Sequence, residues 1–112
     1  MIRKIIFYKQ YFIEFYTKQK PKVQEKIDFV LDLIKNIQRV PEKFLKHIEG
    51  SQGLYEIRIK IGTITLRIFC CFDKGNLVVL FNGFTKKSQK TPKKEIAQAL
   101  KLMKEYYDEQ KK

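Results

Sequence analysis

The sequence predicts a small α+β fold, in which a short strand and helices precede a three-stranded antiparallel meander and a C-terminal helix. Apolar residues recur at the helical period in the N-terminal third and again near the C-terminus, whereas between residues 54 and 84 they alternate with polar residues. This order of elements is that of an α+β domain. A length of 112 residues favours one domain, residues 1–112, with one hydrophobic core.

The N-terminal part is predicted to contain a strand followed by helical segments. The opening RKIIFYK is a strand candidate, and the next residues place Phe12, Phe15 and Tyr16 at helical spacing. Pro21 suits the first turn of an amphipathic helix that we expect to reach about Gln38. The apolar stripe of this helix consists of Val23, Ile27, Val30, Leu31, Ile34 and Ile37. The following PEKFLKHIEGSQG is predicted to form a short helical turn.

Three strands are predicted after this turn. In LYEIRIKI one face carries Tyr55 and three isoleucines, and the other face carries Glu56, Arg58 and Lys60. A two-residue turn at Gly62-Thr63 leads into the strand ITLRIFCCF, and DKGN forms a loop before the third strand, LVVLFNGF.

The last helix is predicted to begin at Thr91 and Pro92, as a hydroxyl cap followed by proline. Its apolar stripe is predicted to contain Ile96, Ala99, Leu100, Met103 and Tyr107.

The strand registers that follow from these turns place polar residues in a row. If Ile61 faces Ile64, Arg58 lies directly opposite Arg67, where like charges repel. If DKGN is a four-residue loop, Asn82 also lies opposite Arg67. One interpretation is that a carboxylate neutralises the arginines, with Glu56 the nearest candidate and Glu49 another. The other interpretation is a pair of guanidinium groups that bind a phosphate.

Positive charge dominates the composition. Lys and Arg number 24 against 12 Asp and Glu, which gives a net charge of +12. Such an excess indicates an anionic partner: nucleic acid first, then an acidic protein, then a membrane surface. Five lysines lie in GFTKKSQKTPKKEI, directly after the third strand. We expect them to meet phosphates, the alternative being a solvated loop with unspecific charge.

Other site classes find little support in the sequence. No Gly-rich phosphate loop, metal-ligand cluster or Ser-His-Asp set is present, and only Glu56 among the carboxylates shares a face with the two arginines. We expect no cofactor and no metal, no targeting segment or membrane span, and a cytoplasmic location. The neighbouring Cys70 and Cys71 are expected to be reduced packing residues. His47, the single histidine, is expected to have a surface or capping role, and packing is favoured for Tyr55, Tyr106 and Tyr107.

The chain resembles the RelE/ParE toxin superfamily over nearly its whole length, and most of all its phage-derived HigB-like branch. The resemblance rests on GLYEIR at 53–58, the strand arginine Arg67, and FTKK at 84–87 followed by Thr91-Pro92. It implies the toxin of a type II toxin–antitoxin pair, neutralised by a cognate antitoxin that we expect to be a helix-turn-helix protein from the adjacent gene. Many members enter the ribosomal A site and cut mRNA there.

The resemblance also implies roles for particular residues. The family's basic residues correspond to Arg58, Arg67, Lys86 and Lys87, which are the expected catalytic residues. RNA contacts are expected from Lys60, Asn82, Lys90, Lys93 and Lys94. The sequence departs from the family in two respects: Phe69, Cys70 and Cys71 stand where an aromatic hydroxyl is common in this branch, and Asn82 stands where histidine is frequent.

We therefore expect a ribosome-dependent mRNA endoribonuclease that uses the 2′-hydroxyl of the RNA as nucleophile and needs no metal. The protein must orient the attack, stabilise the extra negative charge and protonate the leaving oxygen. A lysine crowded by other cations has a lowered pKa and suits proton transfer. Two alternatives remain at this point: a toxin of the same fold that inhibits DNA gyrase, and a non-catalytic nucleic-acid-binding module.

Overall fold

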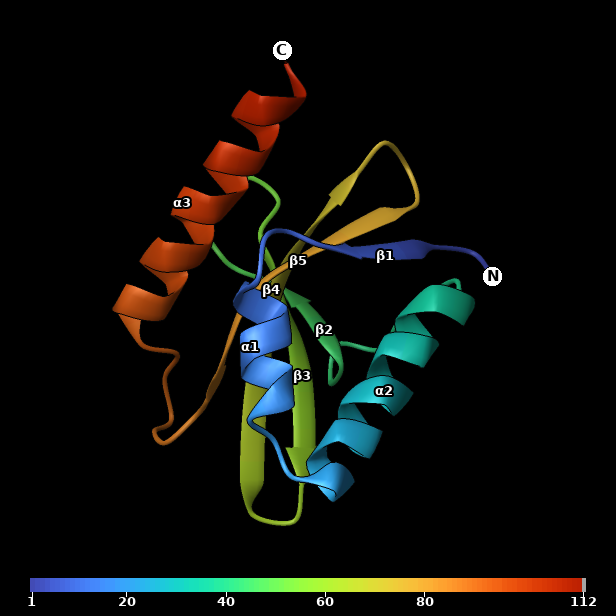
Figure 1. The fold of residues 1–112 in the computed structure, drawn as a ribbon, viewed down its shortest axis with the longest axis vertical. Coiled ribbons are helices and arrows are strands. Elements are labelled where there is room, and N and C mark those ends of the chain that lie inside the picture. The colour runs from blue at the N-terminus through green and yellow to red at the C-terminus, as the bar shows by residue number, and fades with distance from the viewer. Residues whose placement is uncertain (112) are drawn as a thin grey trace.

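A computed structural model describes residues 1–111 and has a five-stranded sheet with helices on both faces (Figure 1). The strand order is β1-β5-β4-β3-β2, with β1 parallel to β5 and the other pairs antiparallel. The elements are β1 (Lys4–Phe7), α1 (Tyr11–Thr17), α2 (Pro21–Asn36), β2 (Leu45–His47), β3 (Tyr55–Ile61), β4 (Ile64–Asp73), β5 (Leu77–Thr85) and α3 (Lys93–Gln110). The predicted α+β class is confirmed, and the meander forms the centre of a larger sheet.

Each face of the sheet buries its own apolar layer. Alternate residues of β3 and β4, such as Ile57 and Ile68, pack under α1 and α2. The residues between them, such as Phe69, pack under α3 together with Val79 and Phe81 of β5. Because helices cover both faces, the middle of β4 is buried continuously instead of alternately.

The two cysteines follow this alternation. Cys70 belongs to the layer under α1 and α2, and Cys71 belongs to the layer under α3. Both are buried and free. Burial raises the pKa of the Cys70 thiol far above its usual range and that of Cys71 to about 11, so neither is a reactive thiolate. The predicted packing role is confirmed.

The segment predicted as a helical turn contains a strand instead. Leu45–His47 forms β2, in which Lys46 pairs with Glu56 of β3. The Arg58 amide donates a hydrogen bond of 2.7 Å to the Phe44 carbonyl oxygen, which extends the pairing with β3 to the residue before β2. Three residues are too few to show an alternating pattern, and pairing with β3 therefore decides their conformation.

The loop between β4 and β5 is one residue shorter than predicted. Asp73 pairs with Leu77, so the loop contains only residues 74–76. Lys74 and Gly75 adopt positive φ angles of 41° and 77°, which suit a three-residue hairpin loop.

A second difference lies further along the same hairpin. Between Ile68 and Cys70 the register shifts, because β5 contains one more residue than β4 there. Together with the shorter loop, this shift places Phe84, and not Asn82, opposite Arg67. The predicted row of Arg58, Arg67 and Asn82 is therefore wrong in its third member.

The helices differ from the sequence prediction in detail. Helix α2 ends at Asn36, which leaves Ile37 outside it and exposed. The buried residues of α3 are Ala99, Leu102, Met103 and Tyr106. Leu100 is exposed, because the apolar face of α3 that contacts the sheet is rotated relative to the predicted stripe. Thr91 does not cap α3: Pro92 takes the N-cap position, and no side chain caps the helix.

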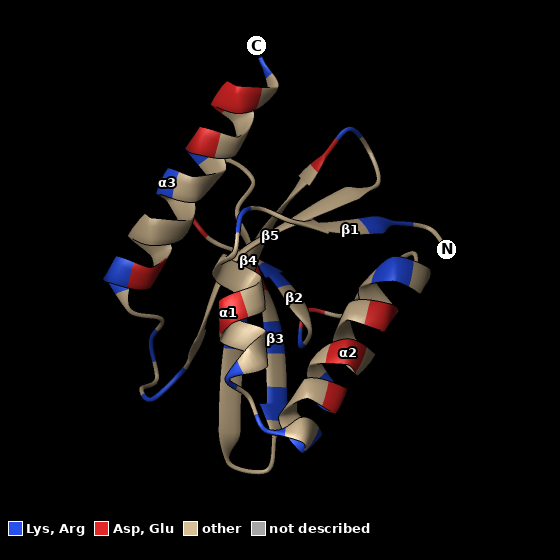
Figure 2. Cartoon of the chain, in the orientation of Figure 1, with Lys and Arg blue, Asp and Glu red and all other residues tan. Residues whose placement is uncertain are grey.

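Charged residues are distributed unevenly over the molecule. Lysines and arginines occur along β3 and in the loop between β5 and α3, whereas acidic residues form bands along α2 (Figure 2). No helix among the described residues is long and apolar enough to cross a membrane.

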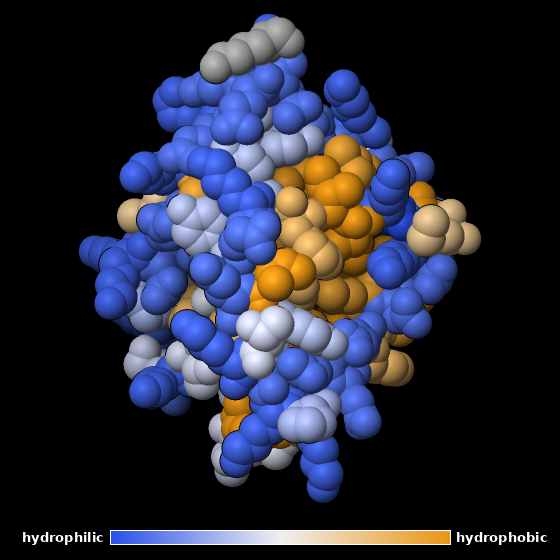
Figure 3. Space-filling model, in the orientation of Figure 1, coloured by the Kyte–Doolittle hydropathy of each residue, from blue (hydrophilic) through white to orange (hydrophobic). Residues whose placement is uncertain are grey.

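An apolar groove of about 470 Å³ lies between α1 and α2. Phe7 and Phe29 line it and are 45% and 52% exposed. Figure 3 shows hydrophobic residues gathered on this side of the molecule, framed by hydrophilic ones. Asp28 and Asp32 of α2 also line the groove, which therefore combines an apolar surface with negative charge.

Gly83 allows α1 to approach β5 closely. A Cβ atom at this position would lie 2.6 Å from Cδ2 of the Phe15 ring. We expect Gly83→Ala to destabilise the fold by about 1–3 kcal/mol through overpacking, measured as a lower urea midpoint with an unchanged m-value. The matched control is the same substitution in a Phe15→Leu background, where the additional loss should be smaller. Equal losses in both backgrounds would show that the ring contact is not the cause.

Candidate nucleic-acid interface

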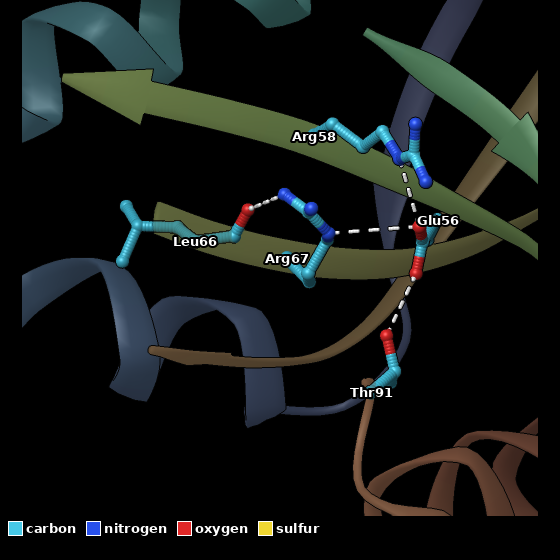
Figure 4. A network of polar contacts seen from close by, with 5 residues as sticks. All are labelled: Glu56, Arg58, Leu66, Arg67 and Thr91. Carbon is cyan, nitrogen blue, oxygen red and sulfur yellow. Dashed lines mark hydrogen bonds and ion pairs between the residues drawn. The ribbon is translucent and has the colours of Figure 1, made fainter. Parts of the chain in front are cut away.

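Two arginines lie side by side on the sheet face that α3 only partly covers. Arg58 of β3 pairs directly with Arg67 of β4, as predicted from the Gly62-Thr63 turn. The carboxylate of Glu56 lies between them, with its Oε2 atom 2.8 Å from Nε of Arg58 and 3.5 Å from Nε of Arg67 (Figure 4).

Glu56 makes this pairing of like charges possible. Its side chain is only 5% exposed, and its other oxygen, Oε1, accepts a hydrogen bond of 3.3 Å from the Thr91 hydroxyl. A buried carboxylate with several partners offsets much of the repulsion between the guanidinium groups. One carboxylate nevertheless serves two arginines, so the trio retains a net positive charge. The carboxylate interpretation is therefore correct for Glu56, and the site keeps its capacity to bind an anion.

Arg67 is the more deeply placed arginine. Its side chain is 11% exposed, and Nη1 donates a hydrogen bond of 3.1 Å to the Leu66 carbonyl oxygen. Nε is within ion-pair distance of Glu56 but has no hydrogen-bond partner among the described residues. Burial chiefly lowers the pKa of Arg67; Arg58 lowers it further, and Glu56 opposes both effects. An added anion would stabilise this buried cation.

Lys86 lies beside the arginines because the ladder between β4 and β5 continues into the loop. Its amide donates a hydrogen bond of 2.8 Å to the Thr65 carbonyl oxygen. The pKa of Lys86 is lowered, first by desolvation and then by Arg67, with Glu56 acting in the opposite direction. A lysine with a lowered pKa gives up its proton more readily than an ordinary one.

Arg67 and Lys86 border a hollow of about 670 Å³ that we name the cationic cleft. Its lining consists of Lys60, Thr63, Thr65, Arg67, Lys86, Lys87, Ser88 and Gln89. Four of these eight residues are cationic and none is acidic. The cleft is thus an open polar surface suited to a polyanion.

Not all of the predicted site residues reach the cleft. The register shift in β5 turns Asn82 toward α3, where its amide nitrogen lies 3.3 Å from the Glu95 carbonyl oxygen. Lys93 and Lys94 are exposed on the first turn of α3 and do not line the cleft. Lys90 lines a neighbouring hollow instead. Arg58 lines that hollow and also a smaller one that it shares with Arg67 and Lys60.

The sequence prediction missed a contribution from β2. Lys46 lies directly opposite Glu56 in the strand pairing, and so on the sheet face that carries Arg58 and Arg67. His47 is on this strand and not in a helical turn; it is exposed, and its ring packs edge-on against Tyr55 at 5.2 Å. No signal in a three-residue strand could have placed either residue.

The tyrosines behave as predicted. Tyr55 packs at the edge of the layer under α1 and α2, with its ring 4.9 Å from that of Phe72. The Tyr106 hydroxyl donates a hydrogen bond of 2.7 Å to Asp73, and the Tyr107 hydroxyl donates one of 2.9 Å to the Phe72 carbonyl oxygen. These hydroxyls are engaged within the fold, away from the cleft.

Comparison with known proteins gives a family and a fold. A profile of the family "Phage derived protein Gp49-like (DUF891)" matches residues 14–104. The chain is similar to the solved RelB-RelE antitoxin-toxin complex of Methanococcus jannaschii, with a TM-score of 0.55 at 18% identity over 78% of this chain and 99% of that one. It is also similar to the RelE-RelB complex of Pyrococcus horikoshii OT3, with a TM-score of 0.54 at 15% identity over 81% and 100% of the two chains. No curated protein matches the chain. At these identities the structural matches establish the fold alone.

Glu56→Gln should destabilise the protein, because Arg58 and Arg67 would lose the carboxylate that both contact. We expect a loss of about 2 kcal/mol or more in the free energy of unfolding, measured with urea at neutral pH. Added sulfate should stabilise the variant more than the wild type, since the anion would replace the missing charge.

The matched control is Glu49→Gln, which removes an exposed carboxylate. It should change stability by less than about 0.5 kcal/mol. A Glu56→Gln protein as stable as this control would contradict the role given to Glu56.

Proposed function

The chain belongs to the Gp49-like family of phage-derived proteins, within the RelE superfamily, and from this we propose that it is the toxin of a type II toxin–antitoxin pair. We propose further that it belongs to the HigB-like branch and acts in the cytoplasm as a ribosome-dependent mRNA endoribonuclease. The observation that carries this proposal is the cationic cleft, in which a buried arginine and a lysine of lowered pKa adjoin a surface without acidic residues.

The cleft supports cleavage by the RNA's own 2′-hydroxyl. In this route the 2′-oxygen forms a bond to the adjacent phosphorus, the 2′-proton passes to solvent, and the bond from phosphorus to the 5′-oxygen breaks. Arg67 and Arg58 would bind the phosphate oxygens and stabilise their added charge. The Lys86 ammonium would give its proton to the leaving 5′-oxygen, and Lys87 would add positive charge at the rim. The upstream product would end in a 2′,3′-cyclic phosphate.

Glu56 acts in this proposal as a positioning residue. Its contacts with Arg58 and Arg67 fix both guanidinium groups relative to the backbone. Held in this way, the arginines need little reorganisation when the phosphate becomes more negative.

One observation favours the alternative of a non-catalytic nucleic-acid-binding module. Phe69, at a position where the superfamily often has an aromatic hydroxyl, is fully buried and stacks on Phe84 with ring centroids 5.8 Å apart. These rings therefore supply neither a proton nor an exposed stacking surface for bases. The catalytic proposal thus depends on Lys86, and a cleavage assay separates the two functions. A supercoiling assay beside it tests the third possibility, inhibition of gyrase.

We expect Arg67→Ala to lower mRNA cleavage in a purified translation system about 10²–10³-fold, because it removes the buried cation nearest the phosphate. The fold should stay within about 2 kcal/mol of the wild type, since Glu56 keeps Arg58 and Thr91 as partners. The matched control is Lys74→Ala, at the exposed hairpin loop far along β4, which should cleave normally.

The role of Lys86 is tested by Lys86→Arg, which keeps the charge but not a proton that can be released near neutral pH. Cleavage should fall about 10²-fold or more if Lys86 is the acid. Full cleavage activity in Lys86→Arg would show that Lys86 acts only through its charge. Full cleavage activity in Arg67→Ala would contradict the assignment of the cationic cleft as the catalytic site.

The 2′-hydroxyl route predicts the behaviour of a modified message. An mRNA with a 2′-deoxy sugar at the scissile position should resist cleavage, whereas the same change one codon away should not. Comparing the two messages tests the mechanism without a metal chelator, which would also remove the Mg²⁺ that the ribosome itself needs. Efficient cutting at the deoxy position would exclude the 2′-hydroxyl as nucleophile and would indicate a hydrolytic mechanism.

We propose that the partner is an antitoxin encoded beside this gene, as a small helix-turn-helix protein, and that it covers the cationic cleft. If the contact is direct, the affinity should fall as salt rises from about 50 to 500 mM. Lys87→Glu should weaken binding, and Phe29→Asp, in the groove between α1 and α2, should not. Salt-independent binding that is lost in Phe29→Asp would place the partner on the groove instead.

A further inference from the structure

A second hollow adjoins the cationic cleft on the side of β2. It has a volume of about 440 Å³ and is bordered by β2, β3 and the loop before α3; we name it the β2 hollow. Lys86 and Gln89 line both spaces and form the wall between them. Arg67 lines the cleft on one side of this wall, and Arg58 lines the β2 hollow on the other.

The β2 hollow carries positive charge that the fold does not neutralise. Lys46 and Lys90 line it in addition to Arg58 and Lys86. Neither Lys46 nor Lys90 has a carboxylate within ion-pair distance among residues 1–111. Two acidic residues also line the hollow: Glu56, which already pairs with two arginines, and the exposed Glu49.

The same hollow also has an apolar side. Ile48 and Ile96 line it and are partly buried against the layer under α3. His47 also borders the hollow, but its ring packs against Tyr55 on the opposite face of the sheet. Phosphate-binding cations beside a small apolar surface can hold the backbone and one base of a single-stranded RNA.

We propose that the β2 hollow is a nucleotide subsite adjacent to the scissile phosphate. Lys46 and Lys90 bind the phosphate of this nucleotide, and its base lies on Ile48 and Ile96. Because Lys86 is shared, consecutive phosphates of one strand lie on its two sides. This inference rests on the proposed function and assigns a role to Lys46, which otherwise has none.

The subsite is tested with short, mixed-sequence 2′-O-methyl oligonucleotides, which lack the free 2′-hydroxyl needed for cleavage. Affinity is measured by fluorescence anisotropy between about 50 and 200 mM salt. Lys46→Ala should lower the affinity several-fold and reduce the slope of log affinity against log salt by about 0.7, the value for one lost phosphate contact on a single strand.

The apolar side of the hollow gives a result of a different kind. Ile48→Ser should lower the affinity without changing the salt slope, because it removes apolar contact with the base and no charge. His47→Ala, on the same strand but with its ring on the other face, should change neither. Lys74→Ala is the matched control for a lost exposed lysine and should leave both affinity and slope unchanged. Thermal melts identify any variant that fails to fold, and Lys46→Gln then replaces Lys46→Ala.

The outcomes separate this inference from the proposed function. Wild-type binding and mRNA cleavage with unaltered binding by the Lys46 and Ile48 variants would overturn the subsite alone. Failure of the wild type to bind any oligonucleotide at low salt would also overturn the subsite, whereas failure to cleave mRNA in the translation system would overturn the proposed function.

Discussion

The contact of Glu56 with Arg58 and Arg67 is the interaction on which the cationic face depends. The two-residue turn between β3 and β4 places the arginines opposite each other, in an arrangement that is repulsive by itself. One buried carboxylate, itself hydrogen-bonded by Thr91, holds both guanidinium groups and leaves a net positive charge. The contact also joins β3 and β4 to the loop before α3, because Thr91 lies in that loop. The lysine-rich loop is thereby held beside the arginines.

The extra residue in β5 decides which side chains share this face. Phe81 packs in the layer under α3, and the next residue, Asn82, also reaches toward α3 through its contact with Glu95. Two consecutive side chains on one side of a strand are the consequence of a β-bulge. Beyond the bulge Phe84 lies opposite Arg67 and closes the apolar layer at the border of the cleft. The bulge thus separates the packed part of this face from its cationic part.

The two faces of the molecule differ in what they present. On one side lie the cleft and the β2 hollow, where lysines without an ion-pair partner among residues 1–111 surround the arginines. On the other side α1 and α2 border an apolar groove that includes carboxylates. Part of the net charge of +12 gathers at the cleft and the β2 hollow, where it creates a local field for a polyanion. The partner surfaces suggested by the two faces are therefore chemically distinct.

Local patterns in the sequence determined the helices, β3, β4 and the hairpin between them. The helical period of Val23, Ile27 and Val30 and the alternation of Ile57 and Ile59 each reflect burial of one side of an element. A two-residue turn fixes its register without help from the rest of the chain, which is why Arg58 and Arg67 could be paired in advance. The same reasoning identified Glu56 as their nearest carboxylate.

Only the tertiary structure decided β2, the bulge in β5 and the parallel pairing of β1 with β5. Three residues of β2 carry no periodicity, so Lys46 and His47 acquired their positions solely by pairing with β3. A bulge adds one residue without a signal in an apolar run such as LVVLFNGF, and together with the shorter hairpin loop it moved Asn82 away from the position opposite Arg67. These features depend on contacts between segments far apart in the chain, whereas the features predicted correctly depend on neighbours within a few residues.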